Sequence, residues 1–185
     1  MNALDLDRQL CFALYSASRA MTASYKDLLA ELGITYPQYL VMLVLWEEGS
    51  NDEGVTVKRL GERLQLDSGT LSPLLSRLES LSFVTRHRSA EDSRRVLVRA
   101  TAEGAAAKER AECVPARIGE RTNLDPASMP ELLETLRALT RNLRAEPAPV
   151  ESPDPPCRTF ELAPRICIDS APLNPYCTTD PTDHH

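Results

Sequence analysis

A cysteine and two tyrosines lie on one predicted helical stripe near the N-terminus. The segment from Leu6 to Leu29 has the apolar spacing of a single long helix. Phenols donate hydrogen bonds to a thiolate, and hydrogen bonding to the charged form lowers the pKa of a thiol. We therefore predict that the cysteine is reactive. Intervals of four, three, four and three residues place these side chains on one face: Cys11, Tyr15, Ser18, Thr22 and Tyr25.

The chain after this helix is predicted to form a helix-turn-helix and a hairpin. A second helix begins at Tyr36-Pro37, since proline suits the first helical turn. A turn at 50–54 leads to a short helix capped by Thr56, and a break at 65–67 leads to another helix. Two strands, FVTRHR and RVLVRAT, then flank the polar loop SAEDSR. This order predicts a winged helix-turn-helix in a mainly α protein of the α+β class.

The C-terminal helices are predicted to pair with a second copy of the chain. A long helix starts at about Ala102 and is expected to bend at Pro115. The last helix opens at Ser128 with the pattern of a capping box. Its leucines could pack into the chain's own core, but helices at both ends of a small chain favour a homodimer. Leucines at coiled-coil spacing form a stripe along it: Leu132, Leu136, Leu139 and Leu143.

We assign residues 1–145 to one winged-helix domain. Its DNA-reading part is 55–104, and its dimerisation helices lie at 5–50 and 102–145. The sequence contains no apolar run long enough to cross a membrane, and its first residues lack the pattern of a signal peptide. A cytoplasmic location without membrane contact is therefore expected, where the five cysteines stay mostly reduced.

Composition changes near Pro147, and nine of the 14 prolines occur from this residue onward. Residues 146–185 show no helical or strand period, so we predict a disordered tail. The tail contains seven acidic residues against two arginines, which accounts for most of the net charge of −6. Cysteines recur every ten residues in it, but the spacing matches no compact set of metal ligands, and neither a metal nor a cofactor is expected: Cys157, Cys167 and Cys177.

The predicted reading helix and hairpin carry the candidate DNA contacts. Residues 56–104 contain nine basic and six acidic residues, so this region is positive although the whole chain is not. Small residues at the start of the second helix can approach bases or only cap the helix, and Arg77 can reach a phosphate. Asp92 can orient an arginine fork on a wing that enters the minor groove. The candidates are Ser68, Gly69, Thr70, Ser72, Arg77, Arg86, Arg88, Asp92, Arg94 and Arg95.

Residues from about Leu6 to Leu143 resemble the MarR family of dimeric winged-helix regulators, and within it the organic-hydroperoxide-sensing group, OhrR. The resemblance implies that Cys11 is the peroxidatic thiol of a DNA-bound repressor of a detoxifying gene, and that Tyr25 and Tyr36 bond it from the other subunit. The segments that carry the resemblance are LDRQLCFALYSASRAM, LGITYPQYLVMLVLWE, LGERLQLDSGTLSPLLSRLE and VTRHRSAEDSRRVLV.

Geometry agrees with an intersubunit site. Tyr25 lies 14 residues after Cys11, about 21 Å along a continuous helix. It can therefore meet Cys11 only across a twofold dimer, whereas Tyr15 is one turn away in the same chain. Oxidation of Cys11 by an organic hydroperoxide gives a sulfenic acid, which condenses with a second thiol. Cys113 is the candidate for that thiol, although it could be a buried small residue, and a low-molecular-weight thiol is the other candidate.

Two other functions are compatible with the sequence. The protein could be a MarR-type regulator controlled by a non-covalent phenolic ligand, with Cys11 incidental. It could also be a thiol peroxidase, but the usual peroxidase pairing of a cysteine with arginine or threonine is missing, and the winged helix would have no role. We therefore expect a repressor rather than an enzyme.

Overall fold

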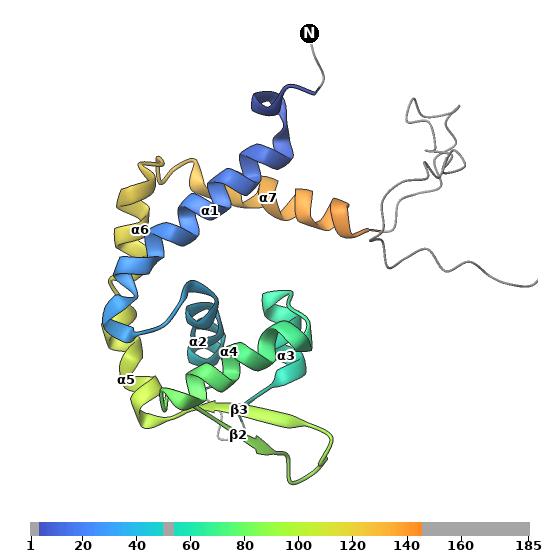
Figure 1. Cartoon of the computed structure of the whole chain (residues 1–185), viewed down its shortest axis with the longest axis vertical. Coiled ribbons are helices and arrows are strands. Elements are labelled where there is room, and N and C mark those ends of the chain that lie inside the picture. The colour runs from blue at the N-terminus through green and yellow to red at the C-terminus, as the bar shows by residue number, and fades with distance from the viewer. Residues whose placement is uncertain (1–3, 50–53, 146–185) are drawn as a thin grey trace, which may run out of the picture. The chain divides into compact units, whose positions relative to one another are not determined.

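The computed structural model describes residues 4–49 and 54–145, which are mostly helical (Figure 1). One compact unit ends at Glu134, within the last helix, and contains every site residue discussed below. In chain order, the elements are η1 (Leu6–Arg8), α1 (Leu10–Leu28), η2 (Ala30–Leu32), α2 (Tyr36–Glu48), β1 (Val55–Thr56), α3 (Val57–Leu64), α4 (Ser68–Ser80), β2 (Val84–Arg88), β3 (Val96–Ala100), α5 (Ala102–Ala111), α6 (Val114–Thr122) and α7 (Met129–Arg144).

Helices α3 and α4 form the predicted helix-turn-helix. Thr56 caps α3, because its hydroxyl accepts the backbone N–H of Arg59 at 3.0 Å. The helix ends at Gln65, whose left-handed conformation (φ 59°) turns the chain. Asp67 then caps α4 by accepting the N–H of Thr70 at 2.8 Å. Both helices bury leucines against α2 and the sheet: Leu60, Leu71, Leu75 and Leu78.

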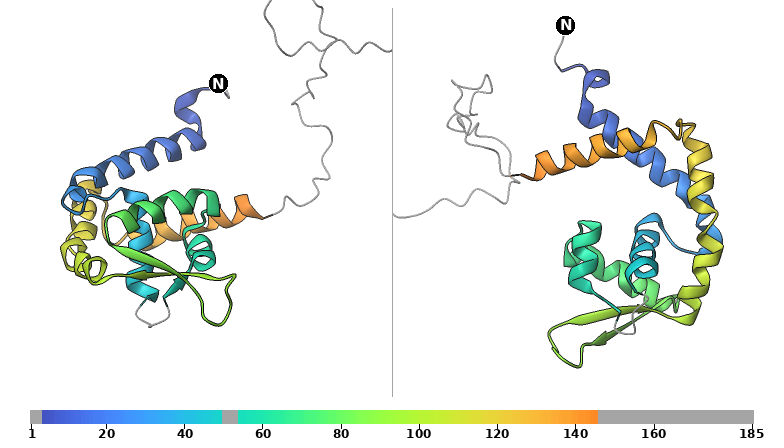
Figure 2. Two further views of the ribbon diagram at one scale, coloured as in Figure 1. Left: turned by 60° about the horizontal axis from the view of Figure 1, so that its bottom comes forward. Right: turned by 180° about the vertical axis from the view of Figure 1, so that it is seen from behind.

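The wing is a three-stranded antiparallel sheet with the order β1-β3-β2. In the β2–β3 pair, Arg86 lies opposite Val98, which is fully buried. The loop from 89 to 95 projects beyond the helices in each view of Figure 2. Its base is closed by the N–H of Ser89, which donates to the carbonyl of Arg95 at 2.9 Å. The winged helix-turn-helix prediction is therefore confirmed, with β1 as a two-residue strand that periodicity did not predict.

Two helix boundaries differ from the expectation. The helix predicted to run continuously from Leu6 is wrong at its start, because extended backbone at Gln9 separates η1 from α1. The long helix predicted from Ala102 is interrupted at Cys113, rather than merely bent at Pro115. Proline lacks the backbone N–H that would donate to the carbonyl of Ala111 and so continue α5. Pro115 therefore falls in the first turn of a new helix, α6.

Helix α7 has no buried residue in the single chain. Its stripe leucines are 39% (Leu132), 38% (Leu136) and 76% (Leu143) exposed. An exposed apolar stripe of this kind suits contact with a second copy. At the helix start, the hydroxyl of Ser128 donates to the carbonyl of Asp125 at 2.8 Å.

Three expectations concern segments outside the described residues: most of the turn at 50–54, the tail at 146–185, and the tail cysteines. The domain boundary at 145 stays a prediction. Among residues 4–49 and 54–145, no helix is both long and apolar enough to pass through a membrane.

Candidate functional site

Two of the predicted tyrosines stack against each other. The ring centroids of Tyr25, near the end of α1, and Tyr36, at the start of α2, lie 4.4 Å apart. Tyr39 extends the cluster at 5.9 Å from Tyr25, and Trp46 follows at 6.1 Å from Tyr39. The turn from α1 into α2 thus brings together two tyrosine rings that are 11 residues apart in sequence.

Burial raises the pKa of the Tyr25 phenol, and the neighbouring Tyr36 and Tyr39 raise it further. The pKa of Tyr36 is likewise raised by burial. These phenols consequently keep their protons at neutral pH and remain hydrogen-bond donors. A pair of protonated phenols is suited to stabilise a thiolate brought to it.

Cys11 lies on the exposed face of α1, away from that pair in its own chain. Helix α1 is continuous from Leu10 to Leu28, so the 14-residue separation of about 21 Å from Tyr25 holds. The surrounding apolar side chains Leu10 and Phe12 are also exposed, by 61% and 38%. Cys11 and its apolar neighbours are therefore exposed in the single chain.

Tyr15 is engaged with Arg19 on the same helix. Nη1 of Arg19 donates to the Tyr15 hydroxyl at 3.3 Å, and the guanidinium carbon lies 5.5 Å from the ring centroid. The hydroxyl oxygen acts as the acceptor in this bond, so its own O–H stays available as a donor. The role of Tyr15 as a donor to Cys11 stays a prediction.

Cys113 lies at the junction between α5 and α6, and it is exposed. Burial raises the pKa of Tyr39, and the neighbouring Tyr36 and, to a smaller extent, Cys113 raise it further. Tyr39 in turn lies 5.9 Å from Tyr25 between ring centroids. A cavity of about 410 Å³ adjoins it, lined by Tyr39, Leu43, Trp46, Glu47, Lys108, Ala111, Glu112 and Pro115.

The start of α4 exposes the small residues predicted to read bases: Ser68, Gly69, Thr70 and Ser72. Thr70 has a second task, since its hydroxyl donates to Oδ2 of Asp67 at 3.0 Å. The cap of α4 is the Asp67 carboxylate, and hydrogen bonds from Thr70 lower its pKa. The serine hydroxyls of this turn are consequently not needed for capping. Arg77, in the last turn, is exposed.

The wing loop exposes Arg88, Arg94 and Arg95. Asp92 stabilises the loop in a way that differs from the expectation, because Oδ1 accepts the backbone N–H of Arg94 at 3.0 Å rather than its guanidinium. The carboxylate thus fixes the turn that presents Arg94 and leaves the side chain of that residue to solvent. An Asx-type turn is the physical reason for the Asp-x-Arg spacing.

Arg86 is placed differently from the other wing arginines. Its Nη2 and Nε contact Oε2 of Glu79 on α4 at 2.6 and 3.0 Å, and its side chain is 30% exposed. Nη2 also reaches the hydroxyl of Ser76 at 3.3 Å. The charge of Arg86 is therefore directed towards α4, and its predicted DNA contact stays a prediction.

A groove of about 700 Å³ separates α3 and α4 from the wing. Its lining brings together residues from all three parts, with Lys58 at the start of α3, Ser72 on α4, and Arg94 on the wing. Sequence analysis missed Lys58, whose side chain is 88% exposed. Its position two residues after a capping threonine could have indicated it, because helix N-termini attract phosphates.

An organic hydroperoxide resistance transcriptional regulator of Bacillus subtilis is 49% identical over 140 residues, covering 72% of this chain and 92% of that protein. The chain belongs to the MarR family. Within it, the similarity is to the organic-hydroperoxide group. The regulator TtmR of Methylorubrum extorquens is 45% identical, covering 80% of this chain and 74% of TtmR, and a SarA/Rot transcriptional-regulator model matches residues 23–111.

Solved MarR structures give the same picture. Reduced AbfR bound to DNA is 34% identical with a TM-score of 0.59, and it covers 75% of this chain and 94% of AbfR. The overoxidised AbfR–DNA complex is 36% identical with a TM-score of 0.60 and the same coverage. PcaV of Streptomyces coelicolor, solved with its natural ligand, is 26% identical with a TM-score of 0.68 and covers 77% and 99% of the two chains. All of these are regulators, which sets aside the thiol-peroxidase alternative.

Proposed function

We propose that this chain is a homodimeric, DNA-binding repressor of the cytoplasm that releases its operator when an organic hydroperoxide oxidises Cys11. One observation carries the proposal. The ring centroids of Tyr25 and Tyr36 lie 4.4 Å apart, while Cys11 lies exposed on α1, about 21 Å along the helix from Tyr25 and too far away to reach it in its own chain. An exposed thiol and a separate pair of phenols complete each other when two chains associate about a twofold axis.

The reduced state is stabilised by hydrogen bonds to the thiolate. Tyr25 and Tyr36 of the partner subunit would donate to the sulfur of Cys11, with Tyr15 of the same chain as a third donor. The exposed apolar side chains around Cys11 suit an organic rather than an inorganic peroxide. The thiolate attacks the outer peroxide oxygen, the O–O bond breaks, and the products are a sulfenic acid and an alcohol.

The second step joins two chains. The thiol of Cys113 of the partner subunit attacks the sulfenic sulfur, an S–S bond forms, and water leaves. Cys113 supports this role because it is exposed and adjoins the tyrosine cluster through Tyr39. The phenols then lose their anionic acceptor, α1 and α2 shift, and the two reading helices lose their spacing on DNA. A low-molecular-weight thiol in place of Cys113 is the alternative for this step.

DNA is bound by the reading helix and the wing. Ser68, Gly69 and Ser72 approach base edges from the start of α4, and Arg94 and Arg95 enter the adjacent groove from the wing. Lys58 joins them because it lines the same basic groove. The relatives compared above include DNA-bound structures of AbfR, which supports this use of the winged helix.

Fluorescence anisotropy of a fragment from the gene's own upstream region tests the proposal. Reduced wild-type protein and Cys11→Ser are titrated onto the fragment, and cumene hydroperoxide is then added. We expect release from wild type and retention by the variant. Equal release from both would remove Cys11 from the mechanism.

A second candidate function rests on the cavity beside Cys113. Its lining is mainly aromatic and apolar, with Lys108 beside Glu47 and Glu112, which suits a small phenolic compound, and the PcaV structure contains a relative with its ligand. Release of DNA by such a compound from a protein with every cysteine blocked would favour this function over the redox one.

A further inference from the structure

Helix α2 is tied to its surroundings along its whole length. At its start, Tyr36 stacks on Tyr25 of α1. Near its end, Nε1 of Trp46 donates to the carbonyl of Gly104 on α5 at 2.9 Å. Its last residues, Glu47 and Glu48, bind α3. One helix therefore connects the tyrosine pair to the helix-turn-helix.

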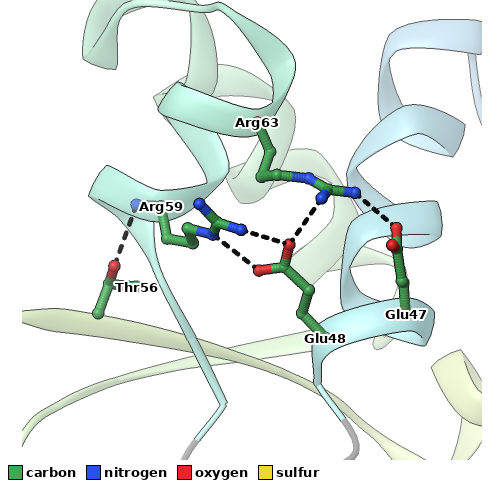
Figure 3. A network of polar contacts seen from close by, with 5 residues as sticks. All are labelled: Glu47, Glu48, Thr56, Arg59 and Arg63. Atoms are coloured by element: carbon green, nitrogen blue, oxygen red, sulfur yellow. Dashed lines mark hydrogen bonds and ion pairs between the residues drawn. The ribbon is translucent and has the colours of Figure 1, made fainter.

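Figure 3 shows how α2 holds α3. Oε2 and Oε1 of Glu48 accept Nε and Nη2 of Arg59, each at 2.9 Å. Oε1 of Glu48 also lies 3.1 Å from Nη1 of Arg63, whose Nη2 reaches Glu47 at 2.6 Å. The Glu48 side chain is only 23% exposed. Two-nitrogen forks of this kind fix orientation as well as distance.

This network pairs two basic residues of the helix-turn-helix with acids of the same chain. Arg59 and Arg63 lie on α3, where a winged-helix protein could use them against phosphates, but their guanidinium groups are directed to α2. These ion pairs instead fix the orientation of α3 relative to α2. Helix α3 packs on α4 through buried leucines such as Leu60 and Leu71, so the orientation of α3 sets that of α4.

We propose that Glu48 is a positioning residue for DNA reading, which holds α3 and α4 at the angle set by α2 and so couples the tyrosine end of α2 to the reading helix. Glu47 supports it through Arg63. The DNA-affinity half of this inference needs only the winged helix, whereas the coupling half rests on the proposed redox function.

The sign of the change in DNA affinity distinguishes a positioning role of Glu48 from a purely electrostatic one. Replacing an acid near a DNA-binding surface by a neutral residue of the same shape removes repulsion from phosphates, so affinity should rise slightly. A positioning role requires the opposite sign. Glu62 offers a matched control on α3, because its side chain is 53% exposed and its ion pair with Lys58 is 3.9 Å long.

The experiment measures operator affinity of the full chain before and after cumene hydroperoxide, for wild type, Glu48→Gln and Glu62→Gln. We expect Glu48→Gln to weaken binding of the reduced protein by about threefold to tenfold, and to shrink the ratio of oxidised to reduced Kd by a similar factor. Glu62→Gln should leave the ratio unchanged and bind as well as wild type or better.

A second variant tests the same ion pair in case Glu48→Gln fails to fold. Arg59→Lys keeps the charge but loses the fork, and it should weaken reduced binding in the same direction. Reduced Glu48→Gln that binds DNA as tightly as Glu62→Gln would overturn the proposal. If wild type responds to peroxide, a Glu48→Gln protein with the same ratio of oxidised to reduced Kd as wild type would overturn it too. If wild type itself fails to respond to peroxide, the redox function fails, while the comparison of reduced affinities still decides the positioning role.

Discussion

Arg86 of β2 and Glu79 of α4 form an ion pair through two guanidinium nitrogens at 2.6 and 3.0 Å, which fastens the wing to the reading helix. The backbone N–H of Arg86 also donates to Oε1 of Glu79 at 3.3 Å. The hydrogen bonds from the Arg86 guanidinium lower the pKa of the Glu79 carboxyl, so the pair stays charged at neutral pH. The angle between wing and helix decides whether both reach adjacent grooves, and this pair contributes to that angle.

The substitution Arg86→Lys should therefore weaken operator binding although the charge is kept. A lysine cannot reproduce the planar fork, so the wing loses its fixed angle. We expect a loss of about threefold to tenfold, the net size of one typical hydrogen bond. Anisotropy titrations measure it, with Arg77→Lys on the exposed face of α4 as the control. Equal effects of the two substitutions would mean that Arg86 acts only as a charge.

The exposed wing arginines should behave as phosphate or minor-groove contacts. Arg94→Ala is expected to reduce operator affinity and to lower the slope of log K against log salt concentration by about 0.9, which corresponds to one released counterion. Arg117→Ala on α6, outside the reading unit, should leave the slope unchanged. Titrations at several salt concentrations give both slopes, and a wild-type slope in Arg94→Ala would exclude the contact.

Local signals in the sequence predicted most of the fold. The capping residues Thr56 and Asp67 marked the helix-turn-helix, and alternation marked the hairpin. Features set by distant contacts were missed. Strand β1 is two residues long and exists because Val55 pairs with Val98, more than forty residues away. The same reason explains Arg86, since only the tertiary structure brings Glu79 against it and turns a candidate DNA contact inward.

The candidate site divides in the same way. Stripe spacing placed Cys11 and Tyr25 correctly on one helix, but the rings that lie beside Tyr25 come from α2. No sequence spacing relates residues on α2 to the α5–α6 junction, where Cys113 lies. The Glu48 network was missed for an equal reason: acids at a helix end and arginines in the next helix are ordinary until packing brings them together.

Gly104→Ala should destabilise the protein because α5 passes very close to the sheet. A Cβ at this position would lie 2.0 Å from the carbonyl oxygen of Phe83 and 3.3 Å from Cε of Met42. Such overpacking costs about 1–3 kcal/mol of the free energy of unfolding. Gly119→Ala is the matched control, since nothing lies within 4 Å of its added Cβ, and alanine should stabilise α6 by about 0.5–1 kcal/mol. Urea denaturation measures both, and equal effects would contradict the close approach.

Asp27 should confer stability that depends on pH. Arg121 on α6 donates to its carboxylate, which lowers the pKa of Asp27 from 3.8 to about 2. A carboxyl whose pKa is lower in the folded state stabilises the protein above about pH 4, and this contribution disappears as the pH falls towards 2. Asp27→Asn should therefore melt below wild type at pH 6, and the two melting temperatures should converge near pH 2. A constant difference across this range would show that the ion pair is not its cause.

Peroxide treatment should join two chains through Cys11 and Cys113. Both thiols are exposed, and Cys113 lies beside the tyrosine cluster to which Cys11 of a second copy would be brought. On a non-reducing gel, wild type should shift from 20.5 kDa to twice that mass, whereas Cys113→Ser should stay at the monomer position and hold a sulfenic acid that dimedone traps. A variant with serine at Cys157, Cys167 and Cys177 should still cross-link as wild type does. If cross-linking survives in Cys113→Ser but disappears in the tail variant, the second thiol lies in the tail. If wild type holds a trapped sulfenic acid and forms no cross-link, the second thiol is a low-molecular-weight one.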